Sequence, residues 1–278
     1  ASSSWANKGW VWRLPEQIQK INDFDLPSLQ KYVGKTQREL TNKRDFKNNG
    51  KEKILIVGDS QSADIMNIMS EVGVIDKYDI IALSINTRCR SPYVNKSERQ
   101  KFWTAENPVV MNAPNLIPEC ERQMDSFMDE KILSKADKIF ISMKWASQSI
   151  PKMKNTIAAI SELSTAKIYL FGNKNLSKSS IDLVNLFGRI NNINEYASKF
   201  RDVGSDKVNE SIAKIPGTTF VDMMKLTCPE VGSCNVLTKD LKPIFFDTVH
   251  LTREGAIYLG MNFLKILSDS DNYNKLSE

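Results

Sequence analysis

One serine stands where a strand is expected to lead into a helix, and its surroundings suit a nucleophile. The apolar run 53–57 ends at Gly58 and predicts a buried strand, and the apolar period over 62–73 predicts a helix. Ser60 lies between them, beside backbone N–H groups that a helix start leaves free to stabilise an oxyanion. Serine is also a favoured N-cap residue, and a purely structural cap is the commoner role of one such serine.

The chain's single histidine supplies a matching base. His250 follows Asp247 by three residues, and Asp222, at the end of a predicted strand, is a second candidate acid. At the three-residue spacing a carboxylate can accept from one ring nitrogen and fix the tautomer, which leaves the other nitrogen to take the proton of a serine. We therefore predict Ser60, Asp247 and His250 as a catalytic set, although a lone histidine often serves packing alone.

Short β-branched runs alternate with helical patterns along the chain. Predicted strands cover 53–57, 79–84, 138–142, 167–171 and 218–222. Predicted helices cover 62–73, 121–135, 151–164, 177–190, 205–214 and 253–268. This alternation predicts an α/β fold with a parallel five-stranded sheet and helices on both faces. Ligands of such sheets bind at the carboxyl ends of the strands, where Ser60 is expected.

Composition narrows the class of protein. The 278 residues are 41% hydrophobic and 26% charged, which suits one large globular domain with or without an appendage. The net charge of +5 is spread along the chain, and a solvated surface explains it better than an anionic partner. No basic block carries interleaved aromatic residues, so nucleic acid is not expected as a partner, and no apolar run has the length of a membrane span.

The first 50 residues differ from the rest. They contain three of the five tryptophans, Trp5, Trp10 and Trp12, followed by a helical pattern and a Lys/Asn-rich run. Because tryptophan side chains gain from burial, we expect 1–50 to form an N-terminal extension packed by its aromatic residues, with a flexible linker as the alternative. The catalytic domain is expected to cover 51–278. The chain lacks an initial Met, so we expect it to be a piece of a longer protein.

Four cysteines allow three sets of disulfide pairings. The short loop between Cys228 and Cys234 contains Pro and Gly and suits a local disulfide, and we favour Cys89 with Cys120 as the second pair. Four reduced thiols in the core are the alternative, and a zinc site is disfavoured because the only histidine is required elsewhere. If the disulfides form, the chain resides in an oxidising compartment.

Two blocks of the sequence resemble the SGNH hydrolases. The stretch GDSQ at 58–61 resembles their GDS block, and DTVHLT at 247–252 resembles their final DxxH block. Each motif alone is common, but here they stand at opposite ends of one α/β pattern with the only histidine in place. The resemblance implies a three-layer, flavodoxin-like SGNH fold, with Ser60 as nucleophile, His250 as base and Asp247 as its partner.

A narrower resemblance covers further segments. GWVWRLP at 9–15, ISMKWAS at 141–147 and the CPEVGSC loop at 228–234 are similar to periplasmic SGNH domains fused to acyltransferase-3 membrane domains. That group includes the O-acetyltransferases of O-antigen and related polysaccharides. The resemblance implies an O-acetyltransferase, in which an acetyl-serine passes its acetyl group to a sugar hydroxyl of lipopolysaccharide O-antigen or a related surface polysaccharide.

The same resemblance implies partners and a location. An acyltransferase-3 transmembrane domain of the same polypeptide would deliver acetyl groups from acetyl-CoA, while this domain would bind no cofactor and no metal. The chain would be the periplasmic domain of a bacterial inner-membrane protein, and we expect a monomer. Two other functions stay open, a carbohydrate or lipid esterase that uses water as acceptor and a non-catalytic polysaccharide-binding module.

The usual oxyanion donors of SGNH enzymes are missing by residue type. Their glycine after the second strand has no counterpart in 84–89, and Trp145 stands where an asparagine would follow the third strand. We expect a backbone N–H near Asn86 and the side chain of Asn173 as substitutes, although Asn173 after Gly172 also suits a turn. Trp145 is expected in the core, with a wall of an acceptor-sugar pocket as the alternative.

Overall fold

The computed structural model describes residues 12–23 and 25–275, so Trp5, Trp10 and residues 9–11 of the GWVWRLP segment lie outside the described part. Five strands of this part form one parallel sheet in the order β2-β1-β3-β4-β5. Their bounds are β1 Lys53–Gly58, β2 Asp79–Ser84, β3 Lys138–Ser142, β4 Lys167–Phe171 and β5 Thr219–Val221. The predicted α/β fold with a five-stranded parallel sheet is confirmed, and the predicted strands match the observed ones closely.

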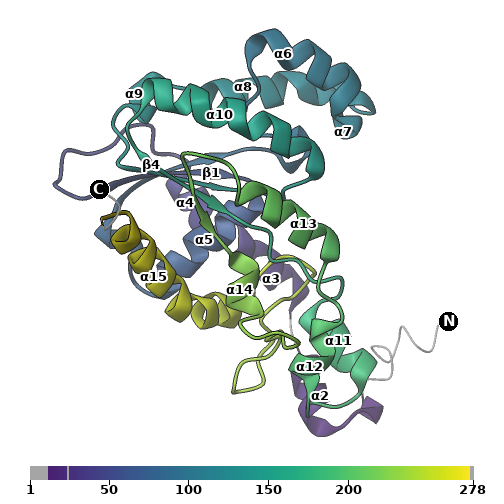
Figure 1. Ribbon diagram of the computed structural model, residues 1–278. Helices are drawn as coiled ribbons and strands as arrows, with labels where there is room; N and C mark the ends of the chain where they lie inside the picture. The colour runs from purple at the N-terminus through teal and green to yellow at the C-terminus, as the bar shows by residue number, and fades with distance from the viewer. Residues whose placement is uncertain (1–11, 24, 276–278) are drawn as a thin grey trace.

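Side chains alternate along the strands and divide the core into two layers. Ile54 and Ile56 of β1 face one layer, Leu55 and Val57 face the other, and all four are buried. Both faces of the sheet are therefore apolar, as a parallel sheet covered on both sides requires. The molecule has three layers, with helices above and below the sheet (Figure 1).

One face of the sheet is covered by the helix that follows β1 and by the C-terminal helix. These are α5 (Ser60–Glu71) and α15 (Arg253–Lys275), which pack against one another below the sheet in Figure 1. On α15, Phe263 stacks on Phe171 at the end of β4, with 5.9 Å between ring centroids. Shorter helices extend this layer, namely α14 (Met223–Thr227), α11 (Ser180–Phe187) and α12 (Ile193–Ser198).

The opposite face is covered by helices from the middle of the chain. The α-helices on this side are α6 (Lys96–Lys101), α7 (Pro108–Met111), α8 (Ile117–Phe127), α9 (Glu130–Leu133), α10 (Ile150–Leu163) and α13 (Val203–Ile212). A π-helical turn, Phe102–Glu106, joins α6 to α7 and buries Phe102 and Trp103 in this layer. No helix was predicted between 90 and 116, because these turns are too short to show a period.

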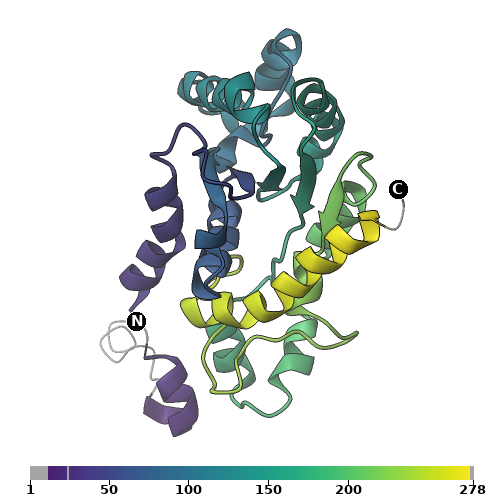
Figure 2. The ribbon, with the colours of Figure 1, turned by 90° about the vertical axis from the view of Figure 1, so that its left-hand side faces the viewer.

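Three short helices precede the sheet. They are α2 (Glu16–Ile21), α3 (Leu26–Val33) and α4 (Lys35–Leu40), and α4 packs along α5 (Figure 2). Aliphatic and polar contacts hold them, since Ile18 is buried and Thr36 donates to Asn67 of α5 at 2.7 Å. The expected aromatic packing is wrong for Trp12, whose surface is 59% exposed. Buried aliphatic residues of this segment, and not the side chain of Trp12, pack it against the rest of the protein.

Helix ends differ from prediction where local capping decides. The predicted helix 121–135 is two helices, α8 and α9, because the carboxylate of Asp129 caps the start of α9. The predicted helix 177–190 shortens to α11, since the side chain of Ser179 caps its start and Gly188 ends it in the left-handed region. Hydrophobic periodicity does not register such caps, so it locates helices better than their ends.

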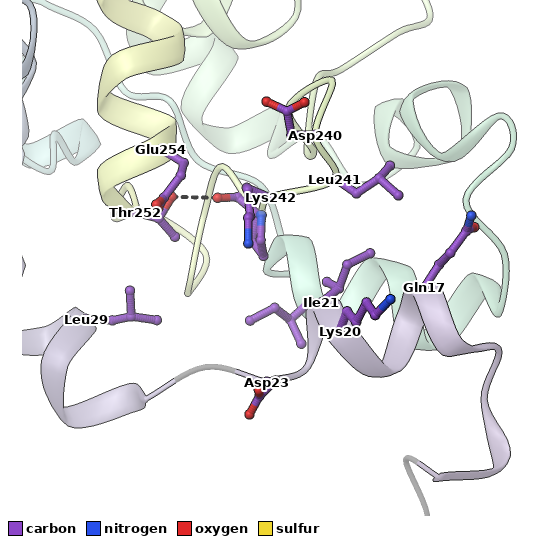
Figure 3. A pocket seen from close by; sticks show the side chains of 12 residues that line it. Gln17, Lys20, Ile21, Asp23, Leu29, Asp240, Leu241, Lys242, Thr252 and Glu254 are labelled. Carbon is purple, nitrogen blue, oxygen red and sulfur yellow. Dashed lines mark hydrogen bonds between the residues drawn. The ribbon is translucent and has the colours of Figure 1, made fainter.

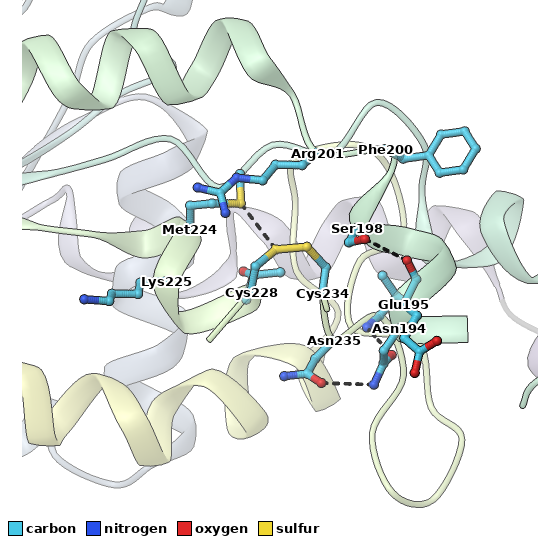
Figure 4. Close-up of a disulfide and its surroundings, with 12 residues drawn as sticks. Asn194, Glu195, Ser198, Phe200, Arg201, Met224, Lys225, Cys228, Cys234 and Asn235 are labelled. Atoms are coloured by element: carbon cyan, nitrogen blue, oxygen red, sulfur yellow. Dashed lines mark hydrogen bonds between the residues drawn. A yellow bond between two sulfur atoms is a disulfide. The ribbon is translucent and has the colours of Figure 1, made fainter. Parts of the chain in front are cut away.

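Both predicted disulfides are present. Cys89–Cys120 joins the turn after β2 to α8, and Cys228–Cys234 closes the loop after α14 (Figure 4). The carbonyl of Asn194 in α12 accepts from the N–H of Cys234 at 3.0 Å, so the second loop is also held from its side. The disulfides therefore fix two loops that extend from the helical layers.

Removing the two disulfides is expected to cost different amounts of stability. Cys89–Cys120 spans 31 residues and Cys228–Cys234 spans 6. Because a longer closed loop removes more entropy from the unfolded chain, we expect losses of about 3–4 and about 2 kcal/mol in the free energy of unfolding. Urea unfolding of the two paired Cys→Ser variants measures both values. A larger loss from the short loop would contradict this ranking.

Candidate active site

The end of β1 lies where the strand order reverses, with β2 on one side and β3 on the other. Ligands of open α/β sheets bind beyond the strand ends at such a point. The backbones of β1 and β3 approach so closely that a Cβ at Gly58 would lie 1.7 Å from the carbonyl oxygen of Ser142. Gly58 also has a φ of 151°. Glycine at this position lets the chain leave the sheet and place Ser60 at its edge.

Asp59 fixes the turn that presents Ser60. Its buried carboxylate accepts from the N–H of Gln61 at 2.9 Å and from the N–H of Lys144 at 3.0 Å. Burial raises the pKa of Asp59, and these two backbone donors oppose the rise. Asp59 is the N-cap of α5 and Ser60 is the first helical residue, so the alternative role of Ser60 as a cap is excluded.

A narrow loop ahead of α15 presents Asp247 and His250. Phe245 and Leu251 are fully buried and pair as an antiparallel bridge, which sets the width of the loop. The hydroxyl of Thr252 accepts from a backbone N–H in the first turn of α15 and so fixes the exit of the loop. The sequence therefore places both polar residues in one short loop between two anchored ends.

The structure brings the three predicted residues together across the sheet edge. Oγ of Ser60 lies 2.7 Å from Nε2 of His250, and Nδ1 of His250 lies 2.6 Å from Oδ2 of Asp247. Oδ1 of Asp247 accepts from the N–H groups of Val249 and His250 at 2.8 and 2.7 Å. The carboxylate holds the proton on Nδ1, and Nε2 is left to accept the proton of Ser60.

Asp247 stays charged in this environment. Burial raises its pKa, but the hydrogen bonds from the His250 ring and from two backbone N–H groups outweigh that effect, so the pKa lies below its usual range. The alternative acid, Asp222, caps α14 and accepts from the N–H of Lys225 at 3.0 Å. The geometry therefore favours Asp247 as the partner of the histidine.

The side chain of Asn173 forms hydrogen bonds with the backbone of Trp145. The amide of Asn173 accepts from the N–H of Trp145 at 3.0 Å and donates to its carbonyl at 3.1 Å. The indole N–H of Trp145 donates to the carbonyl of Phe171 at 2.7 Å, and Trp145 is buried. The geometry places Trp145 in the core and commits one N–H of the Asn173 amide to the carbonyl of Trp145, so we expect Asn173 to fix the backbone of Trp145 rather than to bind an oxyanion.

Asn173→Ala is expected to reduce stability by about 1–3 kcal/mol, because it leaves the buried backbone groups of Trp145 unpaired. Turnover of an acetyl ester by the folded variant should stay within about threefold of the unchanged protein, whereas loss of an oxyanion donor costs about a hundredfold or more. Asn209→Ala is the matched control, since Asn209 holds the backbone of Asn173 at 2.7 and 2.9 Å. A hundredfold loss confined to Asn173→Ala would restore the oxyanion role.

The N–H of Asn86 is also engaged, because it donates to the side chain of Gln123 at 2.7 Å. Asp59 accepts hydrogen bonds from three N–H groups at the start of α5. The N–H of Gln61 donates to its carboxylate, and those of Ser62 and Ala63 donate to its carbonyl. Within the described part of the chain, the N–H of Ser60 is thus the group of this turn that stays available to an oxyanion.

Three residues beside the site were not predicted. Gln61, Asp64 and Lys174 form a buried charged cluster directly behind Ser60. The available signal was Asp64 itself, a carboxylate one helical turn after Ser60 in the predicted helix. Lys174 carried no such signal, because a lysine in a loop after a strand is usually exposed.

A cavity of about 430 Å³ opens between α2 and the loop ahead of α15 (Figure 3). Leu29 and Thr252 form part of its wall, and Leu29 also packs against Ala63 of α5 and Phe246, whose ring stacks on His250. The polar residues of its wall are Gln17, Lys20, Asp23, Asp240, Lys242, Thr252 and Glu254. The side chains of Leu29 and Phe246 thus separate the cavity from the predicted base.

A parallel α/β sheet with a serine at its switch point, facing a histidine from the C-terminal loop, defines an SGNH hydrolase-type domain. The chain belongs to the family described as the SGNH domain fused to AT3 domains, whose model matches residues 31–265. This class comprises acyl-ester hydrolases and acyltransferases. In residues 12–23 and 25–275 no helix combines the length and the apolarity that crossing a bilayer requires.

Solved structures also resemble the chain. One from Streptococcus pneumonia, described as a platelet activating factor, aligns with a TM-score of 0.47 and 13% identity over 87% of this chain and 95% of that chain. Among curated proteins, no sequence matches this one.

Proposed function

We propose that the chain transfers an acetyl group, by way of an acetyl-Ser60 intermediate, to a sugar hydroxyl of lipopolysaccharide O-antigen or a related surface polysaccharide. The observation that carries the proposal is the hydrogen-bonded series from Asp247 through His250 to Ser60, with separations of 2.6 and 2.7 Å. Such a series activates a serine hydroxyl for covalent acyl transfer.

In the first step Nε2 of His250 takes the proton of Ser60 while Oγ bonds to the carbonyl carbon of the acetyl donor. The N–H of Ser60 faces the negative charge on the carbonyl oxygen. The bond from carbonyl carbon to leaving group then breaks, and His250 returns its proton to that group. Asp247 holds the imidazole in orientation and stabilises its charged form throughout.

In the second step the sugar hydroxyl takes the position of the leaving group. His250 accepts its proton as the sugar oxygen bonds to the acetyl carbon. The bond to Oγ breaks, and Ser60 recovers its proton from His250. The domain needs no cofactor or metal of its own for this sequence, because the serine carries the acetyl group.

The family description supports the source of the acetyl group. We infer an AT3 transmembrane domain in the same polypeptide, which would deliver acetyl groups from acetyl-CoA to Ser60. The two disulfides fit an extracytoplasmic domain, and we infer the periplasm of a bacterial inner-membrane protein. The acceptor is then a polysaccharide on the same side of the membrane.

A carbohydrate esterase is the second candidate, because the same three residues can transfer the acetyl group to water instead of a sugar hydroxyl. The separating experiment incubates the protein, joined to its acyltransferase-3 domain, with acetyl-CoA and O-antigen polysaccharide. The proposal predicts acetyl groups on the polysaccharide, which are lost with Ser60→Ala. Release of acetate with no modified sugar would assign the esterase instead.

Carboxylates of the cavity are expected to bind the acceptor. Sugar hydroxyls donate well to carboxylates, so Asp23→Ala and Asp240→Ala should each raise the KM for polysaccharide by about tenfold. Hydrolysis of p-nitrophenyl acetate should not change, because that ester needs no acceptor sugar. Glu195→Ala, a carboxylate beside a different hollow, is the matched control. An unchanged KM in both Asp variants would show that the cavity does not bind the acceptor polysaccharide.

A further inference from the structure

A lysine and an aspartate form a fully buried ion pair behind Ser60. Asp64 lies one helical turn after Ser60 in α5, and Lys174 lies in the loop after β4. Nζ of Lys174 is 2.8 Å from Oδ2 of Asp64, and the two side chains are 2% and 0% exposed. Few charged residues are buried this completely.

The pair is costly for a protein that needs only stability. Two charges taken out of water lose hydration, and apolar side chains of similar volume commonly fill such a site at no loss. Among the described residues no well-aligned hydrogen bond reaches either oxygen of Asp64, so Lys174 is the main compensation of its charge. Burial raises the pKa of Asp64, and the charge of Lys174 opposes that rise.

The pair connects the segment that bears the nucleophile to the segment that bears the base. Nζ of Lys174 donates to Oε1 of Gln61, the residue after Ser60, at 2.5 Å. The loop of Lys174 also reaches the base, since the N–H of Leu176 donates to the carbonyl of Thr248 at 3.1 Å.

We propose that Asp64 and Lys174 are a positioning pair, which holds the Ser60 turn and the His250 loop against one another for acyl transfer. This inference rests on the proposed roles of Ser60 and His250. Neither residue of the pair touches the reacting atoms. They act through Gln61 on the nucleophile and through the hydrogen bond from Leu176, in the loop of Lys174, to Thr248 on the base.

The pair also balances charge beside the base. The groups that face His250 or flank it on the elements packed around it are Asp247, Ser60, Asp59, Asp64, Lys174, Arg253 and Glu254. Loss of Lys174 leaves the buried carboxylate of Asp64 without its cation, and at the pH values where that carboxylate stays ionised it favours the protonated imidazole, which cannot act as a base. Loss of Asp64 leaves a positive charge with the opposite effect. The acid limb of the rate–pH profile should therefore move to higher pH in Lys174→Met and to lower pH in Asp64→Asn.

The experiment measures kcat and KM for p-nitrophenyl acetate from pH 5 to 9, an assay range chosen to bracket histidine titration. The variants are Lys174→Met, Asp64→Asn and the paired Asp64→Asn/Lys174→Met, which restores electrical neutrality. Lys43→Met is the matched control, because Lys43 pairs with the buried Asp79 at the start of β2, at the edge of the sheet opposite to the carboxyl ends of the strands. Thermal unfolding records which variants are folded, and Ser60→Ala reports whether turnover depends on the proposed nucleophile.

The proposal expects a kcat at least tenfold lower in the folded variants of the pair, with KM within twofold and acid limbs displaced in opposite directions. Lys43→Met should lose only stability. A folded single or paired variant with an unchanged kcat overturns the positioning role. If neither single variant folds, the paired variant decides by its kcat and KM alone. Turnover that survives Ser60→Ala would instead refute the proposed function.

Discussion

Ser60→Ala is expected to lower turnover of an acetyl ester by about a thousandfold or more while the fold stays intact. The serine Oγ is the atom that bonds to the acetyl carbon, and no neighbour at the turn replaces it. Removing one member of such a series removes nearly all the catalysis that the series provides, and the residual rate comes from binding and oxyanion contacts. Initial rates with p-nitrophenyl acetate measure the loss directly.

Ser70→Ala is the matched control for this measurement. Ser70 lies at the far end of the same helix and is exposed, so its loss should leave both stability and turnover unchanged. Equal rates in Ser60→Ala and in the unchanged protein would show that the observed turnover does not pass through this serine. The account of the site would then be wrong, whatever the geometry.

Gly58→Ala is expected to cost about 5 kcal/mol or more of stability, so the variant should fail to fold or unfold at a much lower temperature. The added methyl would stand 1.7 Å from the carbonyl oxygen of Ser142. Both atoms belong to paired strands at the centre of the sheet, so neither backbone can move without breaking the ladder between β1 and β3. Circular dichroism and thermal unfolding measure the outcome.

Gly50→Ala is the control that distinguishes the steric clash at position 58 from the cost of a positive φ. Gly50 has a φ of 74°, but no atom lies within 4 Å of a Cβ added there. Its replacement should therefore cost only about 1–2 kcal/mol, the usual penalty of the left-handed region. Similar losses in the two variants would mean that the approach of β1 to β3 is not what requires glycine at 58.

The sheet was predictable because its strands are buried on both faces. Each of the first four strands has an uninterrupted apolar stretch at its centre, namely 54–57, 80–83, 139–141 and 168–171, a pattern that few other elements show. The order of the strands, β2-β1-β3-β4-β5, was not predicted, because the alternation with helices does not show which strands are neighbours in the sheet. The short helices of 90–116 carry no period of their own and depend on tertiary packing, so the sequence does not indicate them.

The three central residues of the site were predictable because their relations are local. Asp247 and His250 share one short loop, and Ser60 follows its strand within three residues. The sequence does not determine the role of Asn173, because an amide after a strand suits an oxyanion donor as well as a residue that fixes a neighbouring backbone. Only the structure shows that its partner is the backbone of Trp145.

The cluster of Gln61, Asp64 and Lys174 depends on contacts between distant segments. Lys174 and Gln61 are 113 positions apart in sequence, yet their side chains are in hydrogen-bond contact. No residue type or spacing marks such a contact beforehand. The cluster behind Ser60 could therefore be found only from the fold, whereas Ser60, Asp247 and His250 could be predicted from the sequence.

The account depends most directly on an acetyl group carried by Ser60. The deciding measurement incubates the protein with an acetyl donor, stops the reaction in acid, digests the chain and locates the acetyl group by mass spectrometry. The account predicts a single acetyl group on the peptide that contains Ser60, which decreases when polysaccharide acceptor is added before the acid. Acetylation confined to other residues, or turnover without acetyl-Ser60, would contradict it.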